Sequence, residues 1–372
     1  MADVYERLVR SSLSELRPYE PGKPVEEVQR ELGLDRVVKL ASNEGPFGPF
    51  PAALEALRRC AGELNRYPDG GAYRLRAAVA ERNDVAFEEV AFGSGADGVI
   101  DTVSQALLDP GDEVVLGWPS FPSYAIYAAK VGAKPIQVPL GDLRYDLDAM
   151  LDAVSERTKI VYVCHPNNPT GTTNSRAELD AYFERVPEHV LTVLDQAYFE
   201  YIADPDYPNG IAEYFKAGRS VLVVRTFSKI YGLAGLRVGY GIGPAQLVTA
   251  LSKTRRAFDV TTAAQEAALV SLDAEDELAR RRRLNAEGRE QLSRILSAHE
   301  LEPAPASANF VYAPVGEDAQ PLFEALLREG VIVRPLAGFG DPNAIRVTVG
   351  TEDEHLFLDQ ALARVKAQAA AS

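Results

Sequence analysis

One lysine lies in a short segment rich in groups that can bind a phosphate and attack a carbonyl. Lys229 belongs to Thr226-Phe-Ser-Lys229-Ile-Tyr-Gly-Leu-Ala-Gly-Leu-Arg237, just after the β-branched run 221–224. Two hydroxyls, of Thr226 and Ser228, and the guanidinium of Arg237 can hold a phosphate while the lysine amine attacks a carbonyl. Because a free lysine, with a pKa of about 10.4, is protonated at neutral pH, such a role requires burial or cationic neighbours that lower its pKa. An isolated Ser-Lys pair would be typical of a protein surface. The hypothesis of a reactive lysine therefore depends on the neighbouring hydroxyls and the arginine.

A second segment, Phe92-Gly-Ser-Gly-Ala96-Asp97-Gly98, has the composition of a strand that runs into a glycine-rich turn and then a helix. Small residues let backbone N–H groups approach an anion, and a helix N-terminus adds a favourable field. Tight strand–helix turns also need glycine for conformational reasons alone. On its own, this segment leaves both interpretations open.

Two polar loops follow two further apolar runs. Asn168 lies in Val163-Cys-His-Pro-Asn-Asn168-Pro-Thr-Gly, and Asp195 begins Asp195-Gln-Ala-Tyr198. Taken separately, they are typical of a loop-capping asparagine and a turn aspartate. Taken together with the first two segments, they supply the phosphate cradle, amide, carboxylate and lysine that pyridoxal phosphate requires.

These segments must be positioned by a sheet, because the central chain alternates short β-branched runs with helical periods. Strands are predicted at 90–93, 113–117, 135–140, 160–164, 191–195, 221–226 and 238–242, and helices at 96–108, 122–131, 147–155, 176–185 and 245–255. This spacing predicts an α/β domain with a mostly parallel sheet covered by helices on both faces. The last two strands lack a helix between them, so one strand is expected to run antiparallel.

The pattern changes after a long helical region at 261–297. Strands at 309–314, 331–335 and 345–349 and helices at 322–329 and 352–366 predict a small α+β domain. Capping boxes are expected at Ser175 with Glu178 and at Thr351 with Glu354. The Pro/Gly-broken segment 17–22 is expected to be an arm. We therefore predict a large domain at 42–255, and a discontinuous remainder, 1–41 and 256–372, that holds the arm, a connecting helix and the small domain.

The composition excludes several partners. The net charge of −15 disfavours nucleic acids and anionic membranes, and no apolar run approaches the roughly 20 residues that span a bilayer. The only cysteines, Cys60 and Cys164, lie far apart, so a reducing cytoplasm without disulfides is expected. The one dense basic run, Arg280–Arg283, is interpreted as a solvated helix face.

The order of the four segments resembles the fold-type-I pyridoxal-phosphate aminotransferases, and in detail their histidinol-phosphate aminotransferase branch. The resemblance extends over nearly the whole chain, through Arg17-Pro-Tyr19, Ala41-Ser-Asn43-Glu, Arg66-Tyr67-Pro-Asp and Ile345-Arg346-Val-Thr-Val-Gly. It implies transfer of an amino group to a 2-oxo acid such as 2-oxoglutarate in two half-reactions, with pyridoxal 5′-phosphate as cofactor. No metal is expected.

The resemblance also implies residue roles. Lys229 would hold the cofactor as a Schiff base and move the substrate proton, Asp195 would pair with the ring nitrogen, and Asn168 and Tyr198 would bond its phenolic oxygen. Phe121 would stack on the ring. The phosphate would be held by the following residues: Thr226, Ser228, Arg237, and the backbone of Ala96 and Asp97. Tyr67 would reach the same phosphate across a homodimer interface, so each site would need two subunits.

Two arginines, Arg334 and Arg346, lie within apolar runs of the small domain, where a buried charge needs a partner. The resemblance implies that both grip the anionic group of the substrate, with Tyr19 and Asn43 in the same substrate-binding set.

The chain departs from the family pattern at Gly98, Gln196 and His165, where acidic residues or an asparagine are usual. These departures remove no catalytic group but leave the substrate open. Alternatives are an aromatic-amino-acid aminotransferase and a decarboxylase of phosphorylated threonine. A non-catalytic scaffold is disfavoured, because a binding module would not need all of these groups: Lys229, Asp195, Tyr198, Asn168 and Arg237.

Overall fold

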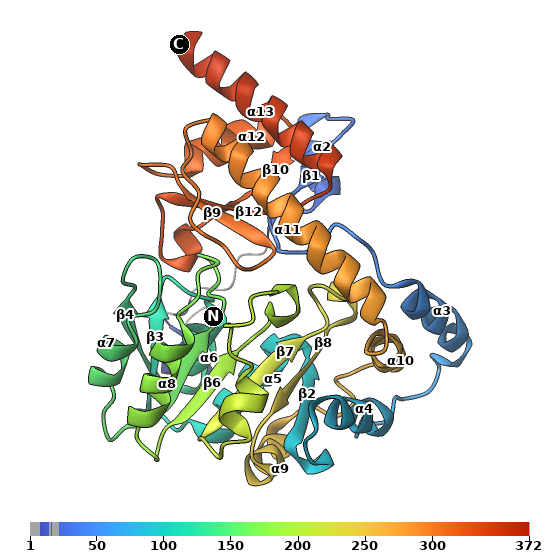
Figure 1. Ribbon diagram of the computed structural model, residues 1–372, viewed down its shortest axis with the longest axis vertical. Coiled ribbons are helices and arrows are strands. Elements are labelled where there is room, and N and C mark those ends of the chain that lie inside the picture. Colours follow the sequence, from blue (N-terminus) through green and yellow to red (C-terminus); the bar gives the residue numbers. More distant parts are fainter. Residues whose placement is uncertain (1–7, 15, 17–21, 372) are drawn as a thin grey trace.

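The computed structural model describes residues 8–14, 16 and 22–371 of the chain (Figure 1). A large sheet with helices around it occupies one end of the molecule, and two smaller sheets with their own helices occupy the other. The predicted arm falls mostly outside the described residues, which include only Gly22 of 17–22.

The large sheet has seven strands in the order β2-β8-β7-β6-β5-β3-β4. Strand β8 runs antiparallel to both of its neighbours and the other pairings are parallel. An antiparallel strand was predicted here because no helix separates the last two strands in the sequence. The strands are β2 (Val90–Ser94), β3 (Glu113–Trp118), β4 (Lys134–Pro139), β5 (Thr158–Cys164), β6 (Leu191–Asp195), β7 (Val221–Thr226) and β8 (Val238–Ile242). Every residue of β7 and β8 is buried, as expected for strands covered on both faces.

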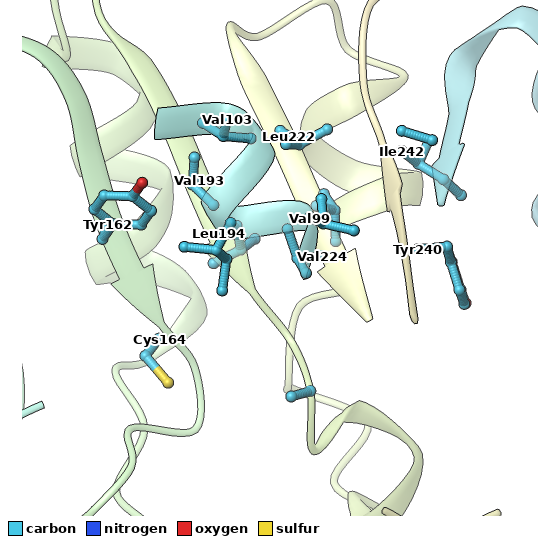
Figure 2. Packing of buried hydrophobic residues seen from close by; sticks show 14 of the residues in the cluster. Val99, Val103, Tyr162, Cys164, Val193, Leu194, Leu222, Val224, Tyr240 and Ile242 are labelled. Atoms are coloured by element: carbon cyan, nitrogen blue, oxygen red, sulfur yellow. The ribbon is translucent and has the colours of Figure 1, made fainter. Parts of the chain in front are cut away.

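Helices pack on this sheet and form one continuous core with it. They are α3 (Pro51–Cys60), α4 (Tyr73–Asn83), α5 (Gly95–Leu107), α6 (Ser123–Val131), α7 (Leu147–Asp152), α8 (Arg176–Arg185), α9 (Ala245–Thr254) and α10 (Thr262–Ser271). Figure 2 shows Val99 and Val103 of α5 beside Leu222 of β7 and Val193 of β6, all within the large core cluster. Because these side chains are fully buried, their packing holds α5 against the sheet. The ends of the strands in this sheet carry the polar loops.

The smaller part is built from both ends of the chain. Strand β1 (Val38–Lys39) pairs with β10 (Val331–Ile332), and β11 (Arg334–Pro335), β12 (Ala344–Thr348) and β9 (Phe310–Pro314) form an antiparallel sheet. The helices are α2 (Val25–Leu32), α12 (Gln320–Arg328) and α13 (Glu352–Ala371). The fold class is thus confirmed, whereas the boundary of the large domain at 42–255 stays a prediction.

The segment predicted as one strand at 331–335 is two short strands in different sheets. Val331 pairs with Val38, whereas Arg334 pairs with Arg346. Only Val333 separates them, and it is buried in the second core. The chain changes partners at this valine, which an apolar run cannot reveal.

The long helical region comprises α10 and the 24-residue α11 (Glu275–Ala298). Leu278, near the start of α11, packs in the large core, whereas Leu292 and Leu296 pack in the second core. One helix therefore connects the two parts, as Figure 1 shows. Both predicted capping boxes are present: Ser175 with Glu178 caps α8, and Thr351 with Glu354 precedes α13.

The interpretation of Arg280–Arg283 as a solvated face holds for only part of the run. Arg280 and Arg283 are exposed, Arg282 is half-buried and donates to the carbonyl of Glu200, and the side chain of Arg281 is only 5% exposed. The run spans a full helical turn, so one of its members necessarily faces inward.

Candidate active site

A single pocket gathers the polar loops at the carboxyl ends of β5, β6 and β7, where ligands bind in α/β sheets. Its lining combines these loops with the start of α5 and with residues of the smaller part. The lining residues are Ala41, Ser42, Asn43, Ala96, Asp97, Phe121, Cys164, Asn168, Asp195, Ala197, Tyr198, Thr226, Ser228, Lys229, Arg237, Arg334, Phe339 and Arg346.

Lys229 follows β7 and opens into this pocket. Burial, followed by the positive charge of Arg346, lowers the pKa of its amine from the ordinary 10.5 to about 8. Its Nζ lies 5.5 Å from the centroid of the Tyr198 ring. A substantial fraction of this amine is therefore neutral near pH 8, as a nucleophile requires.

An anion cradle lies beside the lysine. Nη1 of Arg237 donates to Oγ of Ser228 at 3.4 Å and its Nη2 to the carbonyl of Ser94 at 3.5 Å. The guanidinium packs so closely against Gly95, at φ +77°, that a Cβ there would lie 2.7 Å from Nη2. Since Gly95 opens α5, the hydroxyl, the guanidinium and the helix N-terminus converge on the same end of the pocket.

A buried carboxylate lies at the end of β6. Oδ2 of Asp195 accepts a hydrogen bond from the hydroxyl of Tyr124 at 2.7 Å, and Oδ1 accepts one from the N–H of Ala197 at 3.0 Å. Burial raises the pKa of Asp195, while the two hydrogen bonds and the charge of Lys229 oppose that rise. The carboxylate is thus oriented, and a cationic ligand group would stabilise its charged form.

Hydrogen bonds join the pocket across distant segments. Nδ2 of Asn43 donates to the hydroxyl of Tyr198 at 2.9 Å, and Thr348 of β12 donates to Oδ1 of Asn43 at 3.2 Å. Arg346, in β12, donates from Nη1 to Oδ1 of Asn168 and from Nη2 to the carbonyl of Ala41 at 2.8 Å. The smaller part thereby orients the phenol and the amide that face the lysine.

Two arginines of the smaller part, Arg334 in β11 and Arg346 in β12, lie directly opposite each other in the strand pair. The ring of Phe339 lies 5.4 Å from Cζ of Arg334 and 5.1 Å from Cζ of Arg346. Phe339 also packs in the cluster that Phe121 contacts from the large sheet. The pocket thus has a cationic, aromatic-backed end that suits an anionic substrate group.

Every predicted site residue lines this pocket except Tyr67 and Tyr19. Tyr67 is 83% exposed and stacks on Phe258 at 4.6 Å, away from the lining. Tyr19 lies outside the described residues. Five lining residues were not predicted from the sequence: Ala41, Ser42, Cys164, Ala197 and Phe339. The first four lie within the segments that carry predicted site residues, but no sequence motif marks Phe339.

The three departures from the family pattern lie behind the pocket, outside its lining. Oε1 of Gln196 accepts from Nη2 of the buried Arg225 at 3.3 Å. His165 stacks on Tyr207 with ring centroids 4.7 Å apart, and burial lowers its pKa to about 4. Because none of the three residues belongs to the lining, the charged residues of the pocket are all still present.

Two absences hold for the part of the chain that the structure describes. No helix there has the length and apolar character needed to cross a bilayer. The same residues contain no group of three or more His, Cys, Asp and Glu side chains placed to hold a metal ion. Cys60 and Cys164 are both free and buried.

Comparisons with known proteins identify relatives along the whole chain. Residues 35–364 match the model of the family described as aminotransferase class I and II. A histidinol-phosphate aminotransferase of Moorella thermoacetica is 42% identical over 96% of this chain and 93% of its own. A second protein of that name from Pseudomonas fluorescens is 43% identical over 99% of this chain and 100% of its own.

Solved structures agree. The histidinol-phosphate aminotransferase of Sinorhizobium meliloti, in complex with pyridoxal 5′-phosphate, superposes with a TM-score of 0.86 at 29% identity, covering 96% of this chain and 99% of the other. A double mutant of the aspartate aminotransferase of Thermus thermophilus gives 0.83 at 25% identity over the same shares. The fold is thus shared by enzymes with different substrates.

Proposed function

This chain belongs to the class I and II aminotransferases, and from that premise we propose that it transfers the amino group of histidinol phosphate to 2-oxoglutarate with the help of pyridoxal 5′-phosphate. The observation that carries the proposal is the pairing of Arg334 with Arg346 at the pocket that holds Lys229. Two guanidiniums beside a reactive amine suit a donor that bears both an amine and a phosphate.

The pocket residues fit the cofactor. Asp195 is a buried carboxylate whose charged form a protonated ring nitrogen would stabilise. Ser228, Arg237 and the start of α5 offer hydroxyl, guanidinium and backbone donors for a phosphate. Lys229 offers an amine of lowered pKa for the aldehyde. When bound, pyridoxal 5′-phosphate supplies an aldehyde that bonds amines and a ring that accepts electrons.

Each residue then has a defined task. Lys229 would hold the cofactor through Nζ, and once the amine of the donor displaces it, the same atom would take the proton from the α carbon of the donor and return one. Asp195 would keep a proton on the ring nitrogen. Asn168 and Tyr198 would donate to the phenolic oxygen, while Phe121 would cover the ring face. Thr226, Ser228 and Arg237 would hold the phosphate with the backbone N–H groups of Ala96 and Asp97.

Substrate selection is assigned to the cationic end. Arg334 and Arg346 bind the phosphate of the donor in one half-reaction and the carboxylates of the acceptor in the other. Phosphate and carboxylate each present a pair of oxygens that can accept two hydrogen bonds from one guanidinium. Asn43 orients Tyr198 through a hydrogen bond, and Tyr19 is assigned to the same substrate-binding set. Alternating use of one site by two substrates predicts ping-pong kinetics.

A homodimer and a cytoplasmic location complete the proposal. Tyr67 and Phe258 form an exposed aromatic pair, which a second subunit would cover while Tyr67 reaches the cofactor phosphate of that subunit. Two free cysteines suit a reducing compartment.

A comparison of donors tests the proposed substrate. Values of kcat/KM with 2-oxoglutarate should be at least about 100-fold higher for histidinol phosphate than for phenylalanine, the factor expected when a charge-assisted contact of about 3 kcal/mol is lost. A preference for phenylalanine would overturn the assignment in favour of an aromatic-amino-acid aminotransferase. Release of carbon dioxide from O-phosphothreonine would instead favour a decarboxylase.

A further inference from the structure

The inward-facing member of the arginine run contacts the backbone that carries the catalytic lysine. Nη1 of Arg281 donates to the carbonyl of Ile230 at 3.0 Å, and Nη2 donates to the carbonyl of Gly48 at 2.7 Å. Ile230 is the residue directly after Lys229. One guanidinium of α11 therefore joins the lysine segment to the loop before α3.

The guanidinium itself is held rigidly. Its Nε donates to Oε1 of Glu277, one helical turn earlier, at 2.9 Å. Its Cζ lies 4.3 Å from the centroid of the Phe50 ring. Because only 5% of the side chain is exposed, Arg281 has little freedom to adjust, and its removal would leave the buried carbonyl of Ile230 and the carbonyl of Gly48 without these donors.

The lysine segment is packed tightly around these contacts. Gly232 has φ +69°, and a Cβ there would lie 2.5 Å from the carbonyl oxygen of Gly48 and 2.9 Å from Nη1 of Arg281. The N–H of Gly232 donates to the carbonyl of Lys229 at 3.0 Å. The turn that begins at Lys229 therefore packs directly against the guanidinium.

The same helix reaches the smaller part of the molecule. Asn285 and Arg289, four and eight positions after Arg281 and so on the same helix face, both donate to the carbonyl of Ala308 at 3.3 Å. Ala308 directly precedes Asn309, which donates to the carbonyl of Asn43 at 3.0 Å. One face of α11 thus contacts the lysine segment and the segments that carry the substrate-binding residues.

We propose that Arg281 is a positioning residue for Lys229, which fixes the turn that carries the lysine, holds Nζ at its buried position and so makes the amine reactive. This inference rests on the proposed function for its catalytic meaning. Arg281 touches neither substrate nor cofactor in this role; it acts through the peptide between Lys229 and Ile230.

The charged groups that face Nζ set the direction of the expected effect. Arg346 and Arg237 lower the pKa of Lys229, whereas Glu44 and Asp195 raise it, and burial is the largest influence. Because burial lowers this pKa, a change that lets water reach Nζ raises it toward the ordinary value.

Chemical labelling of the full chain, freed of cofactor, measures this effect without any turnover. Acetic anhydride modifies neutral amines, so the pH dependence of acetylation at Lys229, followed by mass spectrometry of its peptide, gives the midpoint of titration. In Arg281→Met we expect that midpoint to rise by about one pH unit or more. Arg281→Lys, which keeps a donor but not the fork of N–H groups, should recover part of the shift.

Arg283→Met is the matched control, because Arg283 lies in the same run but is exposed and should leave the midpoint unchanged. In the holoenzyme, Arg281→Met should lower kcat by at least about 10-fold, with KM for the amino donor changed less than about 3-fold.

A folded Arg281→Met variant with the midpoint of the unsubstituted protein would overturn the inference. If that variant does not fold, Glu277→Gln decides, because it keeps the arginine and removes only the carboxylate that orients it; an unchanged midpoint there has the same meaning. Failure of the proposed function would appear separately, as a Lys229 that never bonds the cofactor but still titrates as described.

Discussion

Arg346 and Asn168 share a hydrogen bond between Nη1 and Oδ1 although 178 positions separate them in the chain. Arg346 lies in β12 of the smaller part, and Asn168 follows β5 of the large sheet. Both residues are buried. The group assigned to the substrate anion is therefore bonded directly to a group assigned to the cofactor, and it helps to orient that amide.

Arg346→Ala should lower kcat/KM for anionic amino donors by at least about 100-fold, because a charge-assisted contact is worth roughly 3 kcal/mol. The dissociation constant of the cofactor, measured by fluorescence titration, should change less than about 5-fold, since the cradle at Arg237 is intact. Arg346→Lys should recover little, because an ammonium cannot serve both Asn168 and Ala41 with fixed geometry. Equal losses in cofactor and substrate binding would contradict this assignment.

Asp195→Asn should reduce kcat by about 100-fold to 1,000-fold, as expected when a buried charge that stabilises the transition state is removed. The amide is nearly isosteric but cannot keep a proton on the ring nitrogen. Tyr124→Phe is the graded control, because it removes only one of the donors that hold the carboxylate, and should cost about 10-fold or less. Steady-state assays of both variants check the order, and a Tyr124→Phe enzyme worse than Asp195→Asn would contradict it.

Lys229→Met should stabilise the cofactor-free protein. Because the pKa of Lys229 in the folded chain is about 8 rather than 10.5, protonating it costs stability below that pKa, on the order of 3 kcal/mol at most. The gain should be complete below pH 8, shrink as pH rises, and vanish above about pH 10.5, where the amine is neutral in both states. Urea unfolding of the two proteins across this range measures the difference; a destabilised variant at pH 7 would count against a buried amine.

Tyr67→Phe should weaken cofactor binding by about 10-fold, the effect of one hydrogen bond to a charged group, if its hydroxyl reaches the phosphate of a partner subunit. Stacking on Phe258 is kept in this variant, so the dimer should persist. Tyr73→Phe is the control, because Tyr73 is also exposed but is assigned no role. An unchanged dissociation constant, or a chain that sedimentation shows to be a monomer with full activity, would exclude the shared site.

Local patterns predicted most of the architecture, because runs buried on both faces and capping boxes are written in consecutive residues. The strands at 191–195 and 238–242 have the predicted bounds, and the lysine, carboxylate and amide that follow strands meet in one pocket. Because the carboxyl ends of parallel strands lie at the same edge of a sheet, the order of the motifs along the chain was sufficient to predict that these three groups meet.

What escaped prediction depends on contacts between distant segments. Phe339 reaches the site only because the smaller sheet folds in this way, and no sequence motif marks this residue. Arg281 could not be distinguished from Arg280 or Arg283 until the carbonyls of Ile230 and Gly48 were in place. The segment 331–335 divides because its first part pairs with β1 and its second part with β12, and the partner β1 lies far away in the sequence.

The central claim, a covalent link between Nζ of Lys229 and the aldehyde of the cofactor, can be tested by a single measurement. The purified protein is incubated with pyridoxal 5′-phosphate, reduced with borohydride, digested and mapped by mass spectrometry. We predict a phosphopyridoxyl group on the peptide that contains Lys229 and none on that peptide in Lys229→Met. A modification confined to other lysines, or a protein that stays colourless and unmodified, would contradict the account.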